Sequence, residues 1–341
     1  MSIYPAMNVY ATCARPFDAE LASYPTRIAD VARWTEAAGL DGLLVFTDHL
    51  APDPWLVAQI IVERTERIVP LAAVQPSYMH PYTAARMVST ISTLYGRRVD
   101  LNMVTGGYVP HLVSLGNDRD HDTRYDNLVE YGQLMLRLLD GGPVSSKDRS
   151  HYPMIDVGLR PSLPSQLRPR VFVAGTSDAA AGAAASLNAT RLIYPRHLST
   201  YEHDSSTIHG AGIRIGIVAR ESSAKAWRLA NKRYPPDAKA GAVREFAAAL
   251  SGSQWHDELW KDSSGELPAL DPYWMHPFRA STEYCPFLVG SYDEVAEQLA
   301  RYLDLGGNTL ILNHPWEEED LHHARIVLDR VCAPSSESRV G

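Results

Sequence analysis

The chain has 341 residues, of which 45% are hydrophobic and 21% are charged, and its formal net charge at pH 7 is -8. These values are ordinary for a globular protein, and the length is sufficient for one large α/β barrel. The acidic residues are scattered and the basic residues form no stripe, which argues against a nucleic-acid partner.

Strand and helix patterns alternate along the chain. Short apolar runs predict eight strands, at residues 7–12, 42–46, 68–74, 99–104, 170–173, 192–194, 213–219 and 308–312. Apolar residues at helical spacing predict helices between them, at residues 25–38, 55–64, 82–95, 124–139, 177–187 and 292–303, with another around Trp227. Eight such repeats favour a (β/α)8 TIM barrel, of the α/β class, over an open doubly wound sheet. No GxGxxG motif follows a strand, so a dinucleotide-binding fold has little support.

Two segments depart from the alternation. Residues 146–168 are rich in proline, and we expect an irregular excursion over the barrel mouth. Residues 234–286 are too long for an unstructured loop, and we interpret them as an insertion, with a helix at 240–250, that closes over the site as a lid. A helical pair that packs on the barrel or forms a dimer contact fits the same residues equally well. We therefore expect one barrel domain over residues 1–333, with insertions over its C-terminal face, and a disordered tail at 334–341.

The most informative stretch covers residues 96–131. An apolar strand ends in TGG (105–107), a polar loop follows, and a helical pattern begins just after HDTRY (121–125). Strand, loop and helix in that order form one unit of an α/β barrel, where the chemistry lies on the loop after the strand.

A second motif is the run AGTSD at residues 174–178. Glycine permits a close backbone approach, and the free N–H groups at the start of the following helix attract an anion such as a phosphate. Taken alone, the pattern is equally that of a helix cap, with Ser177 as the N-cap. The general phosphate site of TIM barrels follows strands seven and eight, whereas this motif follows strand five.

Both motifs resemble the bacterial luciferase-like family of flavin monooxygenases, and especially its alkanesulfonate and long-chain alkane branch. The family has a strand similar to LNMVTG (101–106), a helix start similar to HDTRY and a GxSDxA run similar to GTSDAA (175–180). Further similar pieces lie at residues 53–58, 76–86 and 288–312, in the family's order, and the resemblance extends over residues 39–324.

The resemblance implies a two-component enzyme, with reduced FMN from a separate flavin reductase, molecular oxygen, and a peroxyflavin that oxygenates a small organic substrate. Carried over by position, the residues that would bind the flavin ring or its phosphate are Asn102, Thr105, His121, Tyr125, Gly175, Thr176 and Ser177. Asn102 also suits a hydrogen bond inside the packed barrel, and Tyr125 suits a half-buried helix position. Arg124 fits a surface ion pair better than a ligand contact.

The catalytic candidates are His121, His314, Arg214 and Arg279. The two histidines are candidate bases, because a neutral imidazole suits proton transfer near pH 7. The resemblance matches Arg214 to an arginine on strand seven of the alkanesulfonate enzymes, and Arg279 to one on their mobile insertion. His49, at the end of the second strand, is also expected at the mouth.

Three departures from the alkanesulfonate pattern concern the substrate. Ala51 replaces a cysteine, Gly216 replaces a histidine on strand seven, and the run 314–316 (HPW) replaces Tyr-Pro-His. A sulfonate is a permanent anion that favours several guanidinium donors. We therefore expect the flavin chemistry with a substrate other than a simple alkanesulfonate.

Three other functions stay open. A deazaflavin (F420) oxidoreductase shares this barrel and transfers hydride without oxygen, although GTSDAA and HDTRY favour FMN. A metal hydrolase could use His111, Asp118, Asp120 and His121, but no HExxH or strand-borne Asp-x-His pair supports it, and we expect no metal. A non-catalytic flavin-binding protein is the third alternative, and oxygen consumption would separate it from an enzyme.

The remaining features concern the compartment and the assembly. Cys13, Cys285 and Cys332 lie far apart without CxxC spacing, so we expect free thiols in a reducing compartment. The N-terminus lacks a signal-peptide pattern, and no apolar run approaches the length of a membrane span. We expect a cytoplasmic protein without a membrane partner, and a homodimer or higher homo-oligomer that uses the helices at 82–95 and 124–139.

Overall fold

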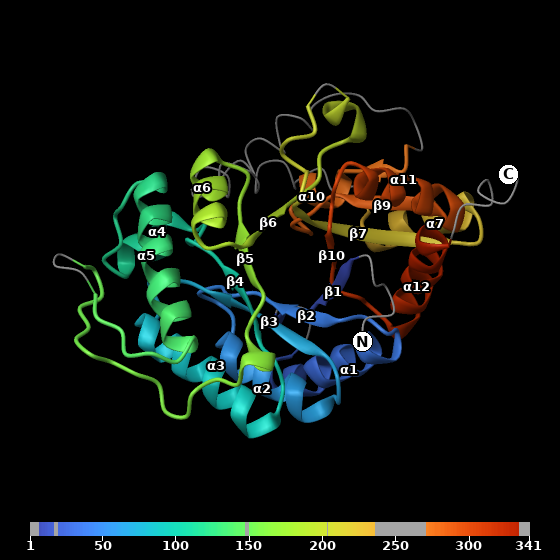
Figure 1. Cartoon of the computed structure of the whole chain (residues 1–341). Helices are drawn as coiled ribbons and strands as arrows, with labels where there is room; N and C mark the ends of the chain where they lie inside the picture. The colour runs from blue at the N-terminus through green and yellow to red at the C-terminus, as the bar shows by residue number, and fades with distance from the viewer. Residues whose placement is uncertain (1–6, 17–19, 147–149, 203, 236–270, 334–341) are drawn as a thin grey trace, which may run out of the picture.

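The computed structural model describes residues 7–16, 20–146, 150–202, 204–235 and 271–333, and it contains the expected (β/α)8 barrel (Figure 1). The eight barrel strands are β1 (Asn8–Thr12), β2 (Gly42–Val45), β3 (Val69–Val74), β4 (Asp100–Met103), β5 (Val171–Ala174), β6 (Thr190–Ile193), β7 (Gly212–Arg220) and β10 (Thr309–Leu312). They pair in parallel, and β10 bonds both to β1 and to β7, which closes the barrel.

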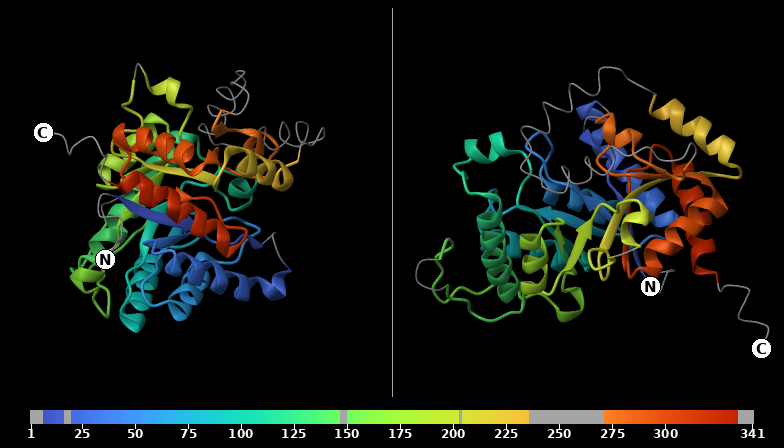
Figure 2. Two further views of the ribbon diagram at one scale, coloured as in Figure 1. Left: turned by 90° about the vertical axis from the view of Figure 1, so that its right-hand side faces the viewer. Right: turned by 90° about the horizontal axis from the view of Figure 1, so that it is seen from above.

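Helices surround the barrel, as the three views in Figures 1 and 2 show. The longer ones are α1 (Tyr24–Ala37), α2 (Pro54–Arg64), α3 (Pro81–Tyr95), α5 (His121–Leu139), α6 (Asp178–Ser186), α7 (Ser223–Arg233), α11 (Tyr292–Asp304) and α12 (Glu318–Cys332). Two shorter α-helices are α4 (Val109–Ser114) and α10 (His276–Arg279), and single 3-10 turns are η2 (Leu21–Ser23), η3 (Ser165–Leu167) and η4 (Leu198–Tyr201). None of the helices in the described ranges is long and apolar enough to cross a membrane.

Side chains fill the barrel interior. Tyr10, Leu44, Leu71, Phe172, Leu192 and Ile311 form a buried cluster of their own. A Cβ at Gly42 would lie 2.6 Å from the Tyr10 ring, so the glycine makes room for that ring. The Tyr10 hydroxyl donates to the buried Asp100 at 2.7 Å. Because the interior is packed, a ligand has to bind at the ends of the strands.

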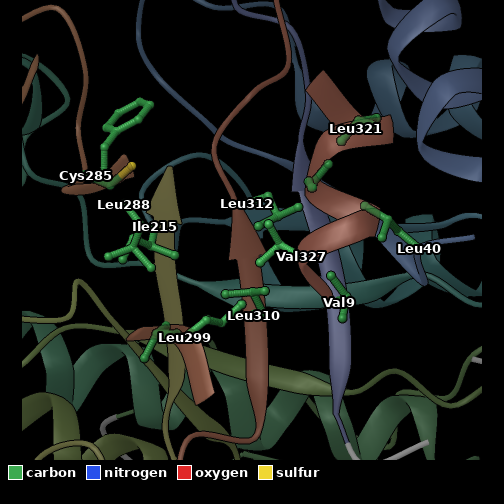
Figure 3. Close-up of a cluster of buried hydrophobic side chains, with 14 of the residues drawn as sticks. Val9, Leu40, Ile215, Cys285, Leu288, Leu299, Leu310, Leu312, Leu321 and Val327 are labelled. Atoms are coloured by element: carbon green, nitrogen blue, oxygen red, sulfur yellow. The ribbon is translucent and has the colours of Figure 1, made fainter. Parts of the chain in front are cut away.

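The main apolar core lies between the strands and the outer helices. Figure 3 shows part of it, where Leu310 and Leu312 of β10 meet Leu321 and Val327 of α12 and Val9 of β1. Each of these side chains is at most 3% exposed. Burial of an aliphatic side chain of this size contributes about 1.5–3 kcal/mol, so these contacts hold α12 firmly against the barrel.

β7 is longer than a barrel strand requires. Residues 212–215 pair with β10 in the barrel, whereas residues 216–220 pair with β9 (Phe287–Ser291), which lies outside it. β8 (Tyr273–Trp274) adds to β9 in antiparallel orientation. At the branch point, a Cβ on Gly216 would lie 2.4 Å from the Phe287 ring. Neither β8 nor β9 was predicted from the sequence: β8 has two residues, and each of the two strands directly follows a proline.

The start of α5 corrects the prediction for residues 121–125. The helix begins at His121, because Asp120 is its N-cap and accepts a hydrogen bond from the Thr123 backbone N–H at 2.9 Å. The HDTRY run is therefore helical, and positions i and i+4 bring His121 and Tyr125 to one face. Arg124 is buried and donates to the Arg119 carbonyl at 3.0 Å, so the predicted surface position of this side chain was wrong.

The described residues of the proline-rich segment 146–168 pack on the outer helices and not over the barrel mouth. Its Met154, Leu159 and Leu163 are buried in the same apolar cluster as residues of α3 and α5. The Ser89 hydroxyl of α3 donates to the Pro161 carbonyl at 2.7 Å. The prediction of an excursion over the mouth was wrong, because the segment's own apolar side chains pack on the outer helices instead.

The segment 234–286 falls largely outside the described residues. The helix expected at 240–250, most of the expected lid, and the tail 334–341 lie in the parts that the structure does not describe. Residues 271–286 are described, and Tyr273, Phe278 and Cys285 are buried in the main apolar core. This end of the segment is therefore part of the wall beside β7.

Candidate active site

A pocket of about 240 Å³ lies at the carboxyl ends of the barrel strands. Its lining comes from the ends of β2 to β7 and the start of α5, including Asp48, His49, Gln75, Asn102, Thr105, His121, Tyr125, Gly175, Thr176, Ser177, Tyr194 and Arg214. All seven predicted cofactor residues line this pocket. In a TIM barrel, this face carries the active site.

Tyr125 connects the two sequence motifs. Its hydroxyl donates to the Ala174 carbonyl at 2.9 Å, and it lies within hydrogen-bonding range of the Thr105 and Ser177 side chains. The rings of Tyr125 and His121 are 5.1 Å apart. Burial raises the pKa of the Tyr125 phenol above 10.0, so it stays protonated and can donate at neutral pH.

The turn between β5 and α6 is shaped for close approach. Gly175 has φ +145, and a Cβ there would lie 2.4 Å from the Tyr125 hydroxyl oxygen and 2.7 Å from the Ala180 Cβ. Ser177 is the N-cap of α6, and its hydroxyl accepts from the Ala180 N–H at 3.2 Å. The N-terminus of α6 and two hydroxyl side chains therefore meet at one end of the pocket, which suits an anion.

Asn102 lies deeper in the same pocket. The side chain is buried, and its Oδ1 has no hydrogen-bond partner. A buried carbonyl oxygen without a partner is costly, so this atom suits a ligand that presents an N–H group. Flavin carries such a group on its ring and a phosphate on its side chain, and the residues at the two ends of the pocket fit both.

Arg214 brings a positive charge to the pocket from β7. Its guanidinium carbon lies 5.9 Å from the centre of the Tyr194 ring, and its Nε is buried without a partner. Among the described residues that line the pocket, Arg214 is the sole arginine or lysine. The side chain is thus placed to receive an anionic group of a substrate.

His121 has a defined orientation at the pocket. Its Nδ1 lies 2.7 Å from the Asp122 carboxylate, which leaves Nε2 as the nitrogen available to a ligand. Proton transfer to or from a ligand in the pocket is therefore open to this residue.

His314 and Arg279 are not among the residues that line the pocket. His314 is buried beside a separate hollow of about 30 Å³, where its ring stacks on Trp316 at 6.5 Å. Its Nδ1 lies 3.8 Å from the buried Glu283 carboxylate. Arg279 is the last residue of α10, and burial lowers the pKa of its guanidinium. This geometry therefore does not support a direct catalytic role for His314 or Arg279 at the pocket.

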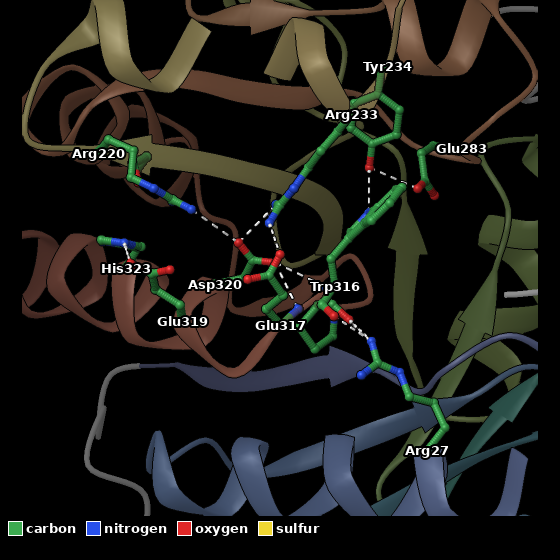
Figure 4. Close-up of polar contacts among 12 residues, drawn as sticks. Arg27, Arg220, Arg233, Tyr234, Glu283, Trp316, Glu317, Glu319, Asp320 and His323 are labelled. Carbon is green, nitrogen blue, oxygen red and sulfur yellow. Dashed lines mark hydrogen bonds and ion pairs between the residues drawn. The ribbon is translucent and has the colours of Figure 1, made fainter. Parts of the chain in front are cut away.

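The loop that carries His314 is held by polar contacts (Figure 4). The Trp316 indole donates to the Tyr234 hydroxyl at 3.2 Å, and that hydroxyl donates to Glu283 at 2.9 Å. Asp320 accepts from Arg233 at 2.9 Å at the start of α12. These contacts give Trp316 and its neighbours a structural part next to the site.

An aromatic stack at the pocket entrance was not predicted from the sequence. The ring of His49 lies 4.8 Å from Tyr108 and 4.9 Å from His111, in near-parallel planes for the tyrosine. Tyr108 and His111 belong to the short α4 region, which the polar sequence concealed. Within the described ranges, no three His, Cys, Asp or Glu side chains form a group that could hold a metal ion.

Comparison with protein families identifies the chain. Residues 8–309 match the family model described as luciferase-like monooxygenase. The chain belongs to the luciferase-like monooxygenase family. The resemblance stated from the motifs is thereby confirmed.

One curated relative and two solved structures show what the chain is similar to. A 4-(gamma-L-glutamylamino)butanoyl-[BtrI acyl-carrier protein] monooxygenase, BtrO, from Niallia circulans is 34% identical over 312 residues, which are 89% of this chain and 91% of BtrO. The long-chain alkane monooxygenase LadA superposes with a TM-score of 0.73 at 14% identity, over 95% of this chain and 91% of LadA. An F420-dependent secondary alcohol dehydrogenase superposes with a TM-score of 0.65 at 15% identity, over 95% of this chain and 99% of the other. The two structural similarities concern the fold.

Proposed function

We propose that this luciferase-like protein is a two-component monooxygenase that uses reduced FMN, supplied by a separate reductase, and molecular oxygen. The observation that supports FMN is the convergence of Asn102, Tyr125 and Ser177 on one pocket. The orphaned Asn102 oxygen suits the ring, and the start of α6 suits the phosphate.

The cofactor supplies the electrons that activate oxygen, and one oxygen atom goes to the substrate while the other leaves as water. The chain itself orients the ring through Asn102 and the phosphate through Tyr125 and Ser177. His121 holds or moves a proton at its Nε2. The packed interior beneath the pocket keeps water from entering through the barrel.

The substrate is a small organic molecule rather than a simple alkanesulfonate. A single guanidinium, from Arg214, lines the described pocket, and Gly216 brings no second polar group from β7. The similarity to BtrO makes acyl thioesters, of the kind attached to a carrier protein, the first substrates to assay.

The cofactor assignment can be tested with a matched pair of serines. Ser177 caps α6 at the pocket, and Ser222 caps α7 away from it with the same backbone contact. Ser177→Ala and Ser222→Ala should each cost about 1 kcal/mol of stability. Ser177→Ala alone should weaken FMN binding, by about tenfold, in a fluorescence titration. Equal FMN affinity in the two variants would argue against the assignment.

The oxygenase assignment needs a separate experiment. The protein is mixed with anaerobically reduced FMN and then with aerated buffer, while oxygen consumption and flavin absorbance are followed. A transient species that precedes oxidised FMN, with a substrate-dependent decay, supports the oxygenase. Reoxidation without any transient, together with tight binding of reduced F420, would favour a hydride-transfer enzyme instead.

A further inference from the structure

A carboxylate surrounded by aromatic rings lies at the pocket lip. Asp48 follows β2 and lines the pocket together with His49, Tyr78, Tyr108 and His111. The His49 ring lies between Tyr108 at 4.8 Å and His111 at 4.9 Å, and Tyr78 lies 5.9 Å from His111. Four rings thus gather next to one negative charge.

Part of the Asp48 carboxylate is engaged by its own loop. Oδ1 accepts from the Leu50 N–H at 2.9 Å and lies 3.2 Å from the His49 Nδ1. Nothing in the described part of the chain hydrogen-bonds to Oδ2, and the side chain is 38% exposed. A carboxylate oxygen is therefore available at the lip.

The opposite charge is Arg214, on the β7 side of the same pocket. Among the described residues it forms no ion pair within 4.0 Å; the Glu283 carboxylate, on which the Arg214 charge also acts, is paired with Arg15 at 3.2 Å. Arg214 and Asp48 do not contact each other, so both charges are left for a ligand that bridges them.

Tyr284 is close enough to Asp48 and Arg214 for both charges to act on it. The residue is 49% exposed, and the charges of Asp48, Arg15, Arg214 and Glu283 all act on its phenol. Of these four charged residues, Asp48 and Arg214 line the pocket, so the pocket has one carboxylate beside aromatic rings and one guanidinium.

This arrangement of charges and rings suits a ligand that carries both an ammonium and a carboxylate group. A carboxylate beside aromatic faces binds an ammonium group through charge and cation–π attraction. A guanidinium binds a carboxylate through paired hydrogen bonds. A metal ion would need more donors than the described residues offer here.

We propose that the corner formed by Asp48, its aromatic neighbours and Arg214 binds the α-amino acid head of the substrate, with the ammonium on Asp48 and the carboxylate on Arg214. The inference rests on the proposed function for the presence of an oxidisable substrate in this pocket. A γ-glutamyl group, as in the name of BtrO's substrate, keeps both charged groups free and is a head of this class.

The test uses three thioesters of N-acetylcysteamine. One carries the γ-L-glutamyl-4-aminobutanoyl group. The second has glutaryl in place of γ-glutamyl and so lacks the ammonium, and the third has a 4-aminobutanoyl head and lacks the carboxylate. Binding to the FMN-loaded protein is measured by calorimetry. The γ-glutamyl probe should bind about 10- to 100-fold more tightly than either truncated probe.

Variants assign the effect to residues. Asp48→Asn keeps the acceptor for the Leu50 N–H, and it should weaken the γ-glutamyl probe about 10- to 100-fold while leaving the glutaryl probe unchanged. Arg214→Gln should weaken the γ-glutamyl and glutaryl probes, which carry the carboxylate, about 10- to 100-fold and leave the 4-aminobutanoyl probe unchanged. Asp118→Asn, an equal change of charge at an exposed site outside the pocket, should alter none of the three.

Two results would overturn the proposal: equal affinity of wild type for the γ-glutamyl and glutaryl probes, or equal weakening of both by Asp48→Asn. Oxygenase activity is read separately, as product formed from reduced FMN and oxygen. Preferential binding of the γ-glutamyl probe without any oxygenated product would contradict the proposed function but support this binding site. Product formation without head selectivity would overturn this site alone.

Discussion

Replacing Gly175 by alanine tests the turn that joins the two motifs. An alanine would keep φ near +145, a region that costs a residue with a side chain about 1–3 kcal/mol. Its Cβ would also lie 2.4 Å from the Tyr125 hydroxyl oxygen, so the phenol must move. The hydrogen bond to the Ala174 carbonyl, at 2.9 Å, contributes about 1 kcal/mol and would be lost. We therefore expect Gly175→Ala to lower the free energy of unfolding by about 2–4 kcal/mol.

The assay is urea denaturation followed by circular dichroism, with an FMN titration on the same samples. Gly182→Ala is the matched control, because a Cβ at Gly182 of α6 meets no atom within 4 Å. In a helix interior that change should stabilise the protein by about 0.5–1 kcal/mol and leave FMN affinity unchanged. Gly175→Ala should weaken FMN binding at least tenfold, since Tyr125 moves.

A double variant isolates the part of the cost that comes from the Tyr125 hydroxyl, because the contact with the Ala180 Cβ at 2.7 Å and the backbone strain both remain. Tyr125→Phe removes the oxygen that meets the new Cβ. The double variant should therefore lose less unfolding free energy than the sum of the losses of the two single variants. The reasoning would be refuted if Gly175→Ala unfolded at the wild-type urea concentration, or if the two costs were additive.

Three further changes probe the surroundings of the pocket. Asn102→Leu removes a buried oxygen that lacks a partner, so FMN affinity should fall about tenfold while stability toward urea denaturation is unchanged. Lower stability with unchanged FMN affinity would contradict the assignment of Asn102 to the flavin ring. Burial raises the Glu283 pKa above 4.5, so its stabilising contribution is complete below about pH 4.5 and is lost as pH rises through the raised pKa. The stability of Glu283→Gln relative to wild type should therefore increase with pH, and a difference that is constant from pH 4 to 8 would refute this. Asp320→Ala removes the carboxylate that Arg233 and Arg220 share, leaving Arg233 paired with Glu317 at 3.6 Å, and should cost about 1–3 kcal/mol. Asp329→Ala, in an exposed pair with Arg325, should cost less than about 0.5 kcal/mol in the same denaturation assay.

The barrel could be predicted from sequence because its signals are local. Each barrel strand is a short apolar run, and each long helix has apolar residues at helical spacing, so the alternation survives errors of one or two residues at the ends. The start of α5 was misplaced because Asp120 acts as an N-cap, whereas the polar residues 121–125 resemble a loop. The polarity of these residues predicted a loop, whereas the Asp120 cap starts the helix at His121.

The predicted cofactor residues gather in one pocket because each lies at the end of a strand or the start of a helix. That rule follows from the barrel and needs no knowledge of side-chain contacts. The Asp48 corner could not be predicted, since the stack of His49 on Tyr108 joins residues almost sixty positions apart. The same holds for His314, whose Nδ1 lies 3.8 Å from the carboxylate of Glu283, 31 positions earlier in the chain.

The branch of β7 has a consequence for exchanging specificity between relatives. The space that a side chain at position 216 would need is the space that the Phe287 ring fills. The alkanesulfonate pattern has a histidine at the position of Gly216, and here such a residue could enter only if the ring at 287 were removed. Positions 216 and 287 therefore have to be changed together when the sulfonate-type strand is introduced into this barrel. Libraries that vary position 216 alone will contain variants in which the packing of β7 against β9 is disrupted.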